Sequence, residues 1–182
     1  MGDDRPHAPR LDPTHSPALI LIGLGANLNS PRWGTPRETL RAALAALEGE
    51  GAAILARSSW YRSAPVPISD QPWFVNAVAS VAAGVDARHL LELMQIVERR
   101  FGRVRGARNA ARVLDLDLLD YLGERYDSPD LTLPHPRLHQ RRFVLEPLAE
   151  IAPEWVHPTL KSTARELLTR LDAGQRVEKL PC

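Results

Sequence analysis

The sequence predicts an α+β fold of the ferredoxin-like kind, in which a β-α-β-β-α-β core forms an antiparallel sheet with helices on one face. Short apolar runs bounded by glycine or proline predict the strands, and two segments with apolar residues at helical spacing predict the helices between them. These elements follow one another in the ferredoxin-like order. Beyond them, loops and short helices dominate, and we expect a C-terminal loop-and-helix extension.

Length and composition indicate one folded domain preceded by an arm. The 182 residues, 44% hydrophobic and 25% charged, are ordinary for a globular domain. Residues 1–17 are rich in proline, aspartate and histidine, with too little apolar surface to offset the entropy of ordering. We therefore expect a disordered N-terminal arm at 1–17 and a single domain at 18–182.

Charge, hydropathy and cysteine content argue against several classes of protein. The net charge is +1, which offers no polycationic surface for nucleic acid. No apolar run reaches the ~18 residues that a membrane helix needs. The one cysteine, Cys182, allows neither an internal disulfide framework nor a thiolate zinc site and fits a reducing compartment. We expect a cytoplasmic monomer that binds neither nucleic acid nor membranes.

The first strand and the first helix are predicted from glycines and a capping motif. Residues 18–24 are an apolar run that ends in a glycine-rich segment with Gly23 and Gly25. Their spacing does not match a dinucleotide-binding fingerprint, so they mark either a tight turn or a close approach of the backbone to another group. A Thr-Pro-Arg-Glu capping box at 35–38 then predicts the start of a helix.

A second strand is expected at residues 52–61, followed at 62–72 by a proline-rich loop that is too long for a hairpin turn. The next strand, residues 74–81, places Phe74 and Asn76 on one face. An aromatic ring and a carboxamide on one face can stack on and hydrogen-bond a flat heterocycle. The alternative is an aromatic packed in the core beside an asparagine that ties down the loop.

The second helix leads directly into an arginine-rich segment. Asp86 caps the helix predicted at 87–101, where Gln95 and Glu98 are i, i+3 neighbours that by themselves indicate only a solvated face. Arginine recurs between residues 99 and 112, and its forked donors suit phosphate oxygens. A basic loop for RNA is the alternative, although it lacks interleaved aromatic residues that would stack on bases.

An Asp-x-Asp strand follows the arginines. Asp115 and Asp117 share one strand face, roughly 6.5–7 Å apart at Cα, while the neighbouring leucines take the other face. Two such carboxylates can hold Mg²⁺, which completes its coordination with water and substrate phosphates. The alternative is a strand with an acidic solvent face. The arginines upstream favour the metal, because Mg²⁺ with arginines on phosphates is the usual equipment for phosphoryl-type transfer.

The C-terminal extension carries a second basic segment at 131–143, in which His135 lies between two prolines that restrict its backbone. A short helix interrupted by Pro147 is expected at 144–150, and a terminal helix at 163–171.

Short motifs follow one another in a characteristic order between about residues 18 and 170. Besides the Asp-x-Asp strand with its Arg112, they are Gly23-Leu24-Gly25-Ala26-Asn27-Leu28, Ser59-Trp60-Tyr61-Arg62-Ser63, Asp70-Gln71-Pro72, Gly102-Arg103-Val104-Arg105, Leu133-Pro134-His135-Pro136, Arg141-Arg142-Phe143 and Pro147-Leu148-Ala149-Glu150-Ile151-Ala152-Pro153. In combination they resemble the 6-hydroxymethyl-7,8-dihydropterin pyrophosphokinases of folate biosynthesis. The resemblance implies transfer of the β,γ-pyrophosphoryl unit of ATP to the hydroxymethyl group of a reduced pterin, with release of AMP and a requirement for two Mg²⁺ ions.

The same resemblance implies a function for individual residues. The two Mg²⁺ ions would be held by Asp115 and Asp117. The residues implied to act in catalysis are Arg103, Arg105, Arg112, Asp115 and Asp117. Those implied to bind ATP are Gln95, Glu98, Arg103, Arg112, Leu131, Thr132, His135 and Arg141. Those implied to line the pterin pocket are Ser63, Ala64, Val66, Phe74, Asn76 and Phe143.

One segment departs from the family pattern. Where family members usually have Arg-Trp-x-Pro-Arg before the Asp-x-Asp strand, this chain has Arg108-Asn109-Ala110-Ala111-Arg112, without tryptophan or proline. In the family this tryptophan helps to cover the pterin, so the change bears on lid closure and pterin affinity. The alternative function is therefore a relative that binds Mg-ATP but has lost or changed pterin turnover.

Overall fold

The computed structural model describes residues 18–103, 111–172 and 174–181. The predicted N-terminal arm and the middle of the arginine-rich loop, including Arg105, lie outside the described residues. In the part of the chain that is described, no helix is long and apolar enough to cross a membrane.

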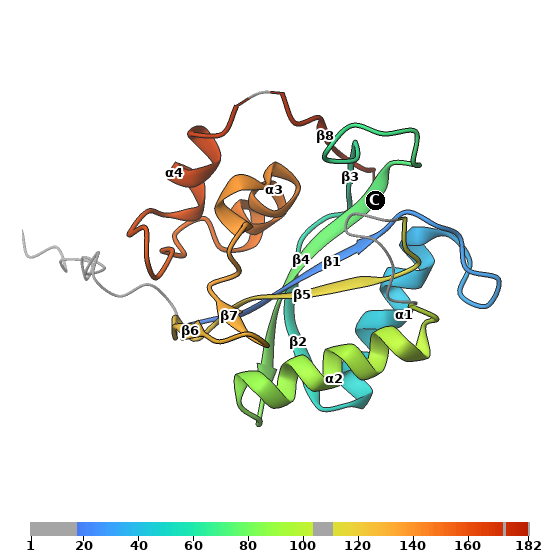
Figure 1. The fold of residues 1–182 in the computed structure, drawn as a ribbon, viewed down its shortest axis with the longest axis horizontal. Coiled ribbons are helices and arrows are strands. Elements are labelled where there is room, and N and C mark those ends of the chain that lie inside the picture. The colour runs from blue at the N-terminus through green and yellow to red at the C-terminus, as the bar shows by residue number, and fades with distance from the viewer. Residues whose placement is uncertain (1–17, 104–110, 173, 182) are drawn as a thin grey trace, which may run out of the picture.

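One antiparallel sheet organises the chain, with strand order β5-β1-β4-β3-β8 and with β2 paired to β4 (Figure 1). Its strands are β1 (Ile20–Ala26), β2 (Ala52–Arg57), β3 (Tyr61–Ser63), β4 (Phe74–Ala83), β5 (Asp115–Tyr121) and β8 (Val177–Lys179). All of these pairings are antiparallel. The predicted α+β fold with an antiparallel sheet is confirmed.

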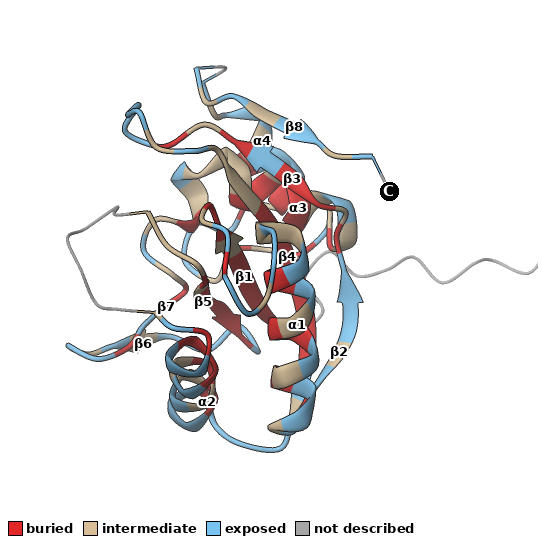
Figure 2. Ribbon diagram, turned by 90° about the vertical axis from the view of Figure 1, so that its right-hand side faces the viewer, coloured by how far each residue is buried: buried red, intermediate tan, exposed pale blue. Residues whose placement is uncertain are grey.

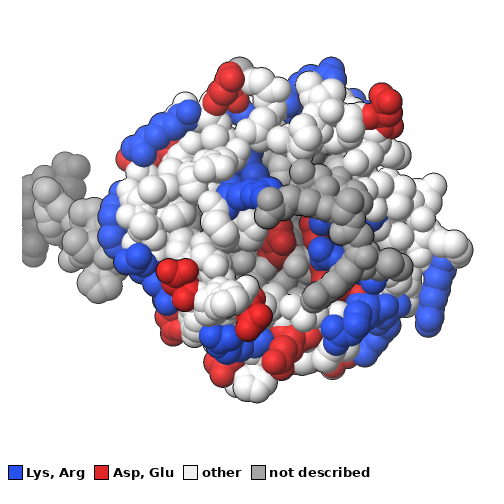
Figure 3. All heavy atoms as spheres, viewed as in Figure 1, with Lys and Arg blue, Asp and Glu red and all other residues white. Residues whose placement is uncertain are grey.

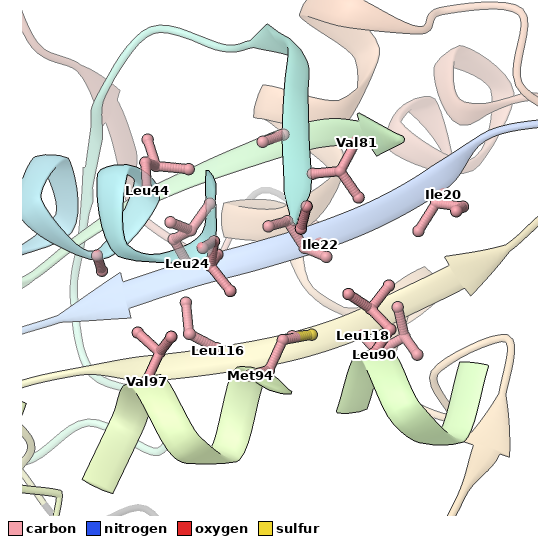
Figure 4. Close-up of a cluster of buried hydrophobic side chains, with 14 of the residues drawn as sticks. Ile20, Ile22, Leu24, Leu44, Val81, Leu90, Met94, Val97, Leu116 and Leu118 are labelled. Carbon is pink, nitrogen blue, oxygen red and sulfur yellow. The ribbon is translucent and has the colours of Figure 1, made fainter. Parts of the chain in front are cut away.

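Two helices, α1 (Pro36–Gly49) and α2 (Ala87–Arg100), cover one face of the sheet (Figure 1). α1 starts at the predicted capping box, in which the side chains of Thr35 and Glu38 accept from each other's backbone N–H. The apolar stripes of both helices meet alternate residues of β1 and β5, such as Leu24 and Leu116, in the larger core (Figure 4). Because side chains alternate along a strand, the residues between them face away from this core.

The C-terminal extension covers the opposite face. α3 (Arg142–Ile151) and α4 (Ala164–Thr169) pack there around the buried Trp155, and Leu21 and Leu119 of the sheet enter this second core. Figure 2 shows burial concentrated in the sheet and on the helix faces turned toward it. The sequence predicted the extension but only one helical layer, whereas the structure has helices on both faces of the sheet.

Two predicted elements differ from the observed ones. The strand predicted at 52–61 is two strands, β2 and β3, because the hydroxyl of the buried Ser58 accepts from the N–H of Val78 at 3.1 Å and interrupts the ladder. The helix predicted to break at Pro147 runs through it as α3, since burial of its apolar residues, among them Leu145 and Leu148, offsets the lost backbone hydrogen bond.

Three short strands were not predicted. β6 (Tyr126–Asp127) and β7 (Thr132–Leu133) form a small hairpin, and β8 adds an edge to the main sheet. Strands of two or three residues show no detectable alternation in sequence, and they form here because a neighbouring strand offers unpaired backbone groups.

Candidate active site

The Asp-x-Asp pair lies on the sheet face opposite to the larger core. Asp115 is paired with Gly25 of β1, and Asp117 with Gly23. A Cβ atom at Gly25 would meet Oδ1 of Asn76 at 3.4 Å and Cβ of Asp115 at 3.9 Å. The absence of a side chain at Gly25 therefore leaves space beside Asp115 and Asn76. Both glycines lie within β1, so they do not form the turn that the sequence also allowed.

A cavity of about 610 Å³ opens above these strands. On the face shown in Figure 3, acidic and basic atoms lie side by side in a hollow of the surface. The cavity brings together both predicted carboxylates, two of the arginines predicted to bind phosphates and all six residues predicted for the pterin pocket, and Arg137 lines it as well. These lining residues are Asp115, Asp117, Arg112, Arg141, Ser63, Ala64, Val66, Phe74, Asn76 and Phe143.

Asp115 lies between two arginines. Its Oδ2 atom accepts a hydrogen bond from Nη1 of Arg112 at 2.8 Å, and Nη1 of Arg103 lies 2.7 Å from Oδ1. Burial, and then the nearby charge of Asp117, raise the pKa of Asp115 against the opposing effect of the arginines. The contact with Arg103 is ionic without hydrogen-bond geometry, so the buried Oδ1 accepts no hydrogen bond from the described residues.

Asp117 faces the second basic segment. Nη1 of Arg141 donates to its Oδ2 at 3.2 Å, and Nε2 of His135 lies 4.0 Å from the same oxygen. Nδ1 of His135 accepts from the backbone N–H of Arg137 at 3.2 Å, so a neutral ring carries its proton on Nε2, toward Asp117. Burial lowers the pKa of His135, while the charge of Asp117 opposes this shift.

Glu98 is a support of the site rather than part of the solvated helix face that its spacing indicated. It is 7% exposed, and its Oε1 accepts from the backbone N–H of Leu116 at 2.7 Å and from Nη1 of Arg103. Burial raises the pKa of Glu98, although these two donors oppose the shift. The residue fastens α2 to β5 between the two aspartates and orients Arg103 toward them.

Six of the predicted ATP-binding residues do not line the cavity. Three of these, Glu98, Arg103 and His135, reach the strand of the aspartates through the contacts given above. The other three lie elsewhere. Gln95 is partly buried on α2, Leu131 is buried in the larger core, and Thr132 is exposed in β7. The N–H of Leu131 donates to Oγ of Ser128, and its C=O accepts from the N–H of Ser128. Their assignment to ATP therefore rests on the resemblance alone, as does that of Arg105, which lies outside the described residues.

In the predicted pterin pocket, each of the two alternative interpretations of Phe74 and Asn76 is correct in part. Nδ2 of Asn76 donates to Oγ of Ser63 at 2.9 Å, which ties down the start of the loop. The same asparagine lines the cavity together with Phe74, which enters neither core. Phe143, at the start of α3, contributes a second aromatic ring to the cavity wall.

Several residues at the site, among them Arg137 and Gln140, were not predicted from the sequence, and two of the unpredicted residues connect its parts. Asn27 is 3% exposed; its Nδ2 donates to Oε1 of Gln71 at 3.3 Å and to the C=O of Pro72 at 3.1 Å, and its Oδ1 accepts from the N–H of Arg112 at 2.8 Å. It therefore joins the end of the proline-rich loop to the strand of the aspartates. Gln175 lines the cavity from the segment before β8. The position of Asn27 within the glycine motif was a usable signal, whereas Gln175 had none.

The donor set suits Mg²⁺. Within the described residues no group of three or more His, Cys, Asp and Glu side chains gathers as a metal site, so a cation here would have few protein ligands. Hard carboxylate oxygens in low number are typical of Mg²⁺, which keeps water and binds substrate phosphates. The buried Oδ1 of Asp115, which accepts no hydrogen bond from described residues, is an oxygen available for such an ion.

The solved structures similar to this chain include Plasmodium falciparum HPPK-DHPS with pteroate. The likeness has a TM-score of 0.64 at 13% identity, over 84% of this chain and 42% of that one. At this identity it supports the fold alone, and this chain spans less than half the length of that protein.

Sequence comparison covers the region that carries the motifs. The model of the 7,8-dihydro-6-hydroxymethylpterin-pyrophosphokinase (HPPK) family matches residues 21–153. The 2-amino-4-hydroxy-6-hydroxymethyldihydropteridine pyrophosphokinase of Haemophilus influenzae is 43% identical over 138 residues, 75% of this chain and 83% of that protein. The protein of the same name from Methylorubrum extorquens is 39% identical over 160 residues, 86% of this chain and 97% of that protein. The chain therefore belongs to the 7,8-dihydro-6-hydroxymethylpterin-pyrophosphokinase (HPPK) family.

Proposed function

We propose that the chain transfers the pyrophosphoryl group of ATP to 6-hydroxymethyl-7,8-dihydropterin, giving AMP and the pterin diphosphate, in folate biosynthesis. The observation that carries the proposal is that paired carboxylates, arginines and an aromatic-amide pocket line one cavity. A phosphate chain over the charged part and a flat ring in the pocket would lie side by side. Holding two substrates in this way supplies much of the rate of a transfer reaction.

Asp115 and Asp117 would hold two Mg²⁺ ions. In support, both carboxylates line the cavity, and the buried Oδ1 of Asp115 accepts no hydrogen bond from the described residues. Bound there, Mg²⁺ would neutralise phosphate charge and lower the pKa of the acceptor hydroxyl. The two aspartates would also keep their strand spacing, because the alternate Leu116 and Leu118 are buried in the larger core.

Arg103, Arg112 and Arg141 would bind phosphate oxygens in place of their present carboxylate partners. Each has a guanidinium nitrogen within 3.2 Å of one of the two aspartates. Their forked donors would orient the phosphates and stabilise charge as it shifts toward AMP. His135 would donate from Nε2 beside Asp117, and Glu98 would keep Arg103 in place. The assignment of Arg105, Gln95, Leu131 and Thr132 to ATP follows from the resemblance.

The pterin would lie between Phe74 and Phe143, with its edge on Asn76. Nδ2 of Asn76 is bonded to Ser63, which leaves Oδ1 to accept from an N–H group of the pterin. Two aromatic faces and one carboxamide suit a flat, polar-edged ring. Ser63, Ala64 and Val66 would line the pocket by their backbone.

We further propose that the protein acts as a cytoplasmic monomer within the single domain at 18–182. In support, one sheet spans the chain from β1 to β8, and the sequence contains one cysteine. Sedimentation of the purified chain at micromolar concentration tests the monomer directly.

The function is tested by AMP formation from ATP with and without Mg²⁺ and with and without the pterin. We expect AMP only when all three are present. ATP binding without pterin-dependent AMP would favour the alternative, a relative whose altered segment at 108–111 has lost pterin turnover. Failure to bind Mg-ATP would refute both functions.

A further inference from the structure

We infer that Gln175, in the tail before β8, is a positioning residue for the phosphate-binding Arg141. Gln175 lies outside the residues 21–153 that the family model matches, yet its side chain lines the cavity. The inference rests on the proposed function, in which Arg141 contacts ATP phosphates.

The helix that begins at the cavity has no side-chain cap of its own. Arg141 occupies the N-cap position of α3 and makes no capping hydrogen bond. The first N–H groups of a helix have no partner within the helix and need an acceptor from elsewhere. Arg141 itself has local backbone hydrogen bonds, with its N–H donating to Leu138 and its C=O accepting from Val144 and Leu145. Another segment can therefore add a partner for the backbone groups on either side of it.

Gln175, in the segment before β8, supplies these partners. Its Oε1 accepts from the N–H of Arg142 at 2.9 Å, and its Nε2 donates to the C=O of Gln140 at 2.8 Å. One carboxamide thus bridges the residues on both sides of Arg141. From this bridged point the Arg141 side chain reaches Asp117, with Nη1 3.2 Å from Oδ2.

The tail is itself anchored on the acceptor side of the cavity. β8 pairs with β3, and Ala64 donates its N–H to the C=O of Arg176 at 3.2 Å. The guanidinium of Arg176 lies 5.0 Å from the centre of the Trp73 ring. Gln175 therefore couples the wall of the pterin pocket to the arginine that faces the phosphates.

A double-mutant cycle of Gln175→Ala and Arg141→Ala tests the coupling, with AMP formation measured in the steady state. We expect Gln175→Ala to lower kcat roughly tenfold with little change in the KM for the pterin, because it removes the two hydrogen bonds that fasten the residues on both sides of Arg141 to the tail. In the Arg141→Ala background the same change should have almost no further effect. Equal fold losses in both backgrounds would overturn the inference, as would full activity of Gln175→Ala.

Glu178→Ala is the matched control. Glu178 lies in the same tail and pairs with Arg62, about half exposed, but it does not line the cavity. Its loss should leave turnover unchanged. A tenfold loss there as well would assign the effect to the tail as a whole and would also overturn the inference.

A readout that does not depend on turnover separates this inference from the proposed function. Hydrogen exchange of the Arg142 N–H should be faster in Gln175→Ala and unchanged in Glu178→Ala. If the unaltered protein forms no AMP with the pterin, the proposed function fails, and the same cycle is read in the affinity for Mg-ATP. Unchanged exchange at Arg142, or additive losses of affinity, would then refute positioning by Gln175.

Discussion

Asp115→Asn tests the charge of Asp115, because it removes the negative charge and keeps the size of the side chain. The carboxylate lies 2.8 Å from Arg112 and 2.7 Å from Arg103, and the substitution removes both charge pairs. It also removes two unfavourable effects, the burial of a charge and its repulsion by Asp117, which are the effects that raise the pKa of Asp115. Because breaking partly buried pairs and relieving desolvation oppose each other, we expect the free energy of unfolding to change by less than ~1 kcal/mol.

The effect on turnover should be far larger. In the proposed function Asp115 is a ligand of Mg²⁺ and holds the position of two phosphate-binding arginines. Loss of a metal ligand at a centre of phosphoryl-type transfer removes about 4 kcal/mol or more of transition-state stabilisation, a fall of roughly 10³-fold in kcat/KM. Asparagine keeps the size of the side chain, so the loss would not reflect a new cavity.

The assay is pterin-dependent AMP release across a range of Mg²⁺ concentrations, together with urea unfolding of the same preparations. Asp127→Asn is the control, because Asp127 is an exposed carboxylate in β6, outside the cavity lining. We expect its turnover to be unchanged. Near-normal AMP release by Asp115→Asn at any Mg²⁺ concentration would refute its assignment as a metal ligand. A loss of activity explained entirely by unfolding of the variant would refute the expectation that its stability changes little.

Two further predictions concern buried polar groups. Asn27→Ala should lower the free energy of unfolding by about 2–3 kcal/mol, since three hydrogen bonds are lost, and should raise the KM for the pterin. Asn27→Asp keeps the acceptor for the N–H of Arg112, so its free energy of unfolding, measured by urea titration, should fall by less. His157 is 4% exposed, and burial followed by the charge of His139 lowers its pKa to about 4, so the folded state prefers the neutral ring. Stability should therefore fall as the pH drops from about 6.5 toward 4, by about 2 kcal/mol at pH 5, and His157→Asn should remove this part of the pH dependence; an unaltered pH profile in that variant would contradict the assignment.

Local patterns in the chain were sufficient for much of the scaffold. The capping box at Thr35 and Glu38 specifies a helix start because its partners lie three residues apart. The alternation of leucine and aspartate placed Leu116 and Leu118 in the core and the two aspartates opposite, as the structure confirms. These patterns can be detected in the sequence because each involves residues that are close along the chain.

Other features depended on elements that are distant in sequence. Glu98 has the spacing of a solvated helix residue, but α2 lies across β5 and buries it against the N–H of Leu116. The strand predicted at 52–61 divides at Ser58 because its hydroxyl is bonded to Val78 of β4. Neither partner could be identified without the tertiary arrangement.

By itself the sequence determined the α+β order of elements, the shared face of Asp115 and Asp117, and the family to which the motifs point. Only the tertiary structure decided that Arg103 and Arg141 each pair with one of these aspartates, and that Asn27 and Gln175 hold the backbone around them. The reason is physical. A face or a cap follows from the periodicity of one element, whereas a hydrogen bond between segments exists only once the sheet has brought those segments together.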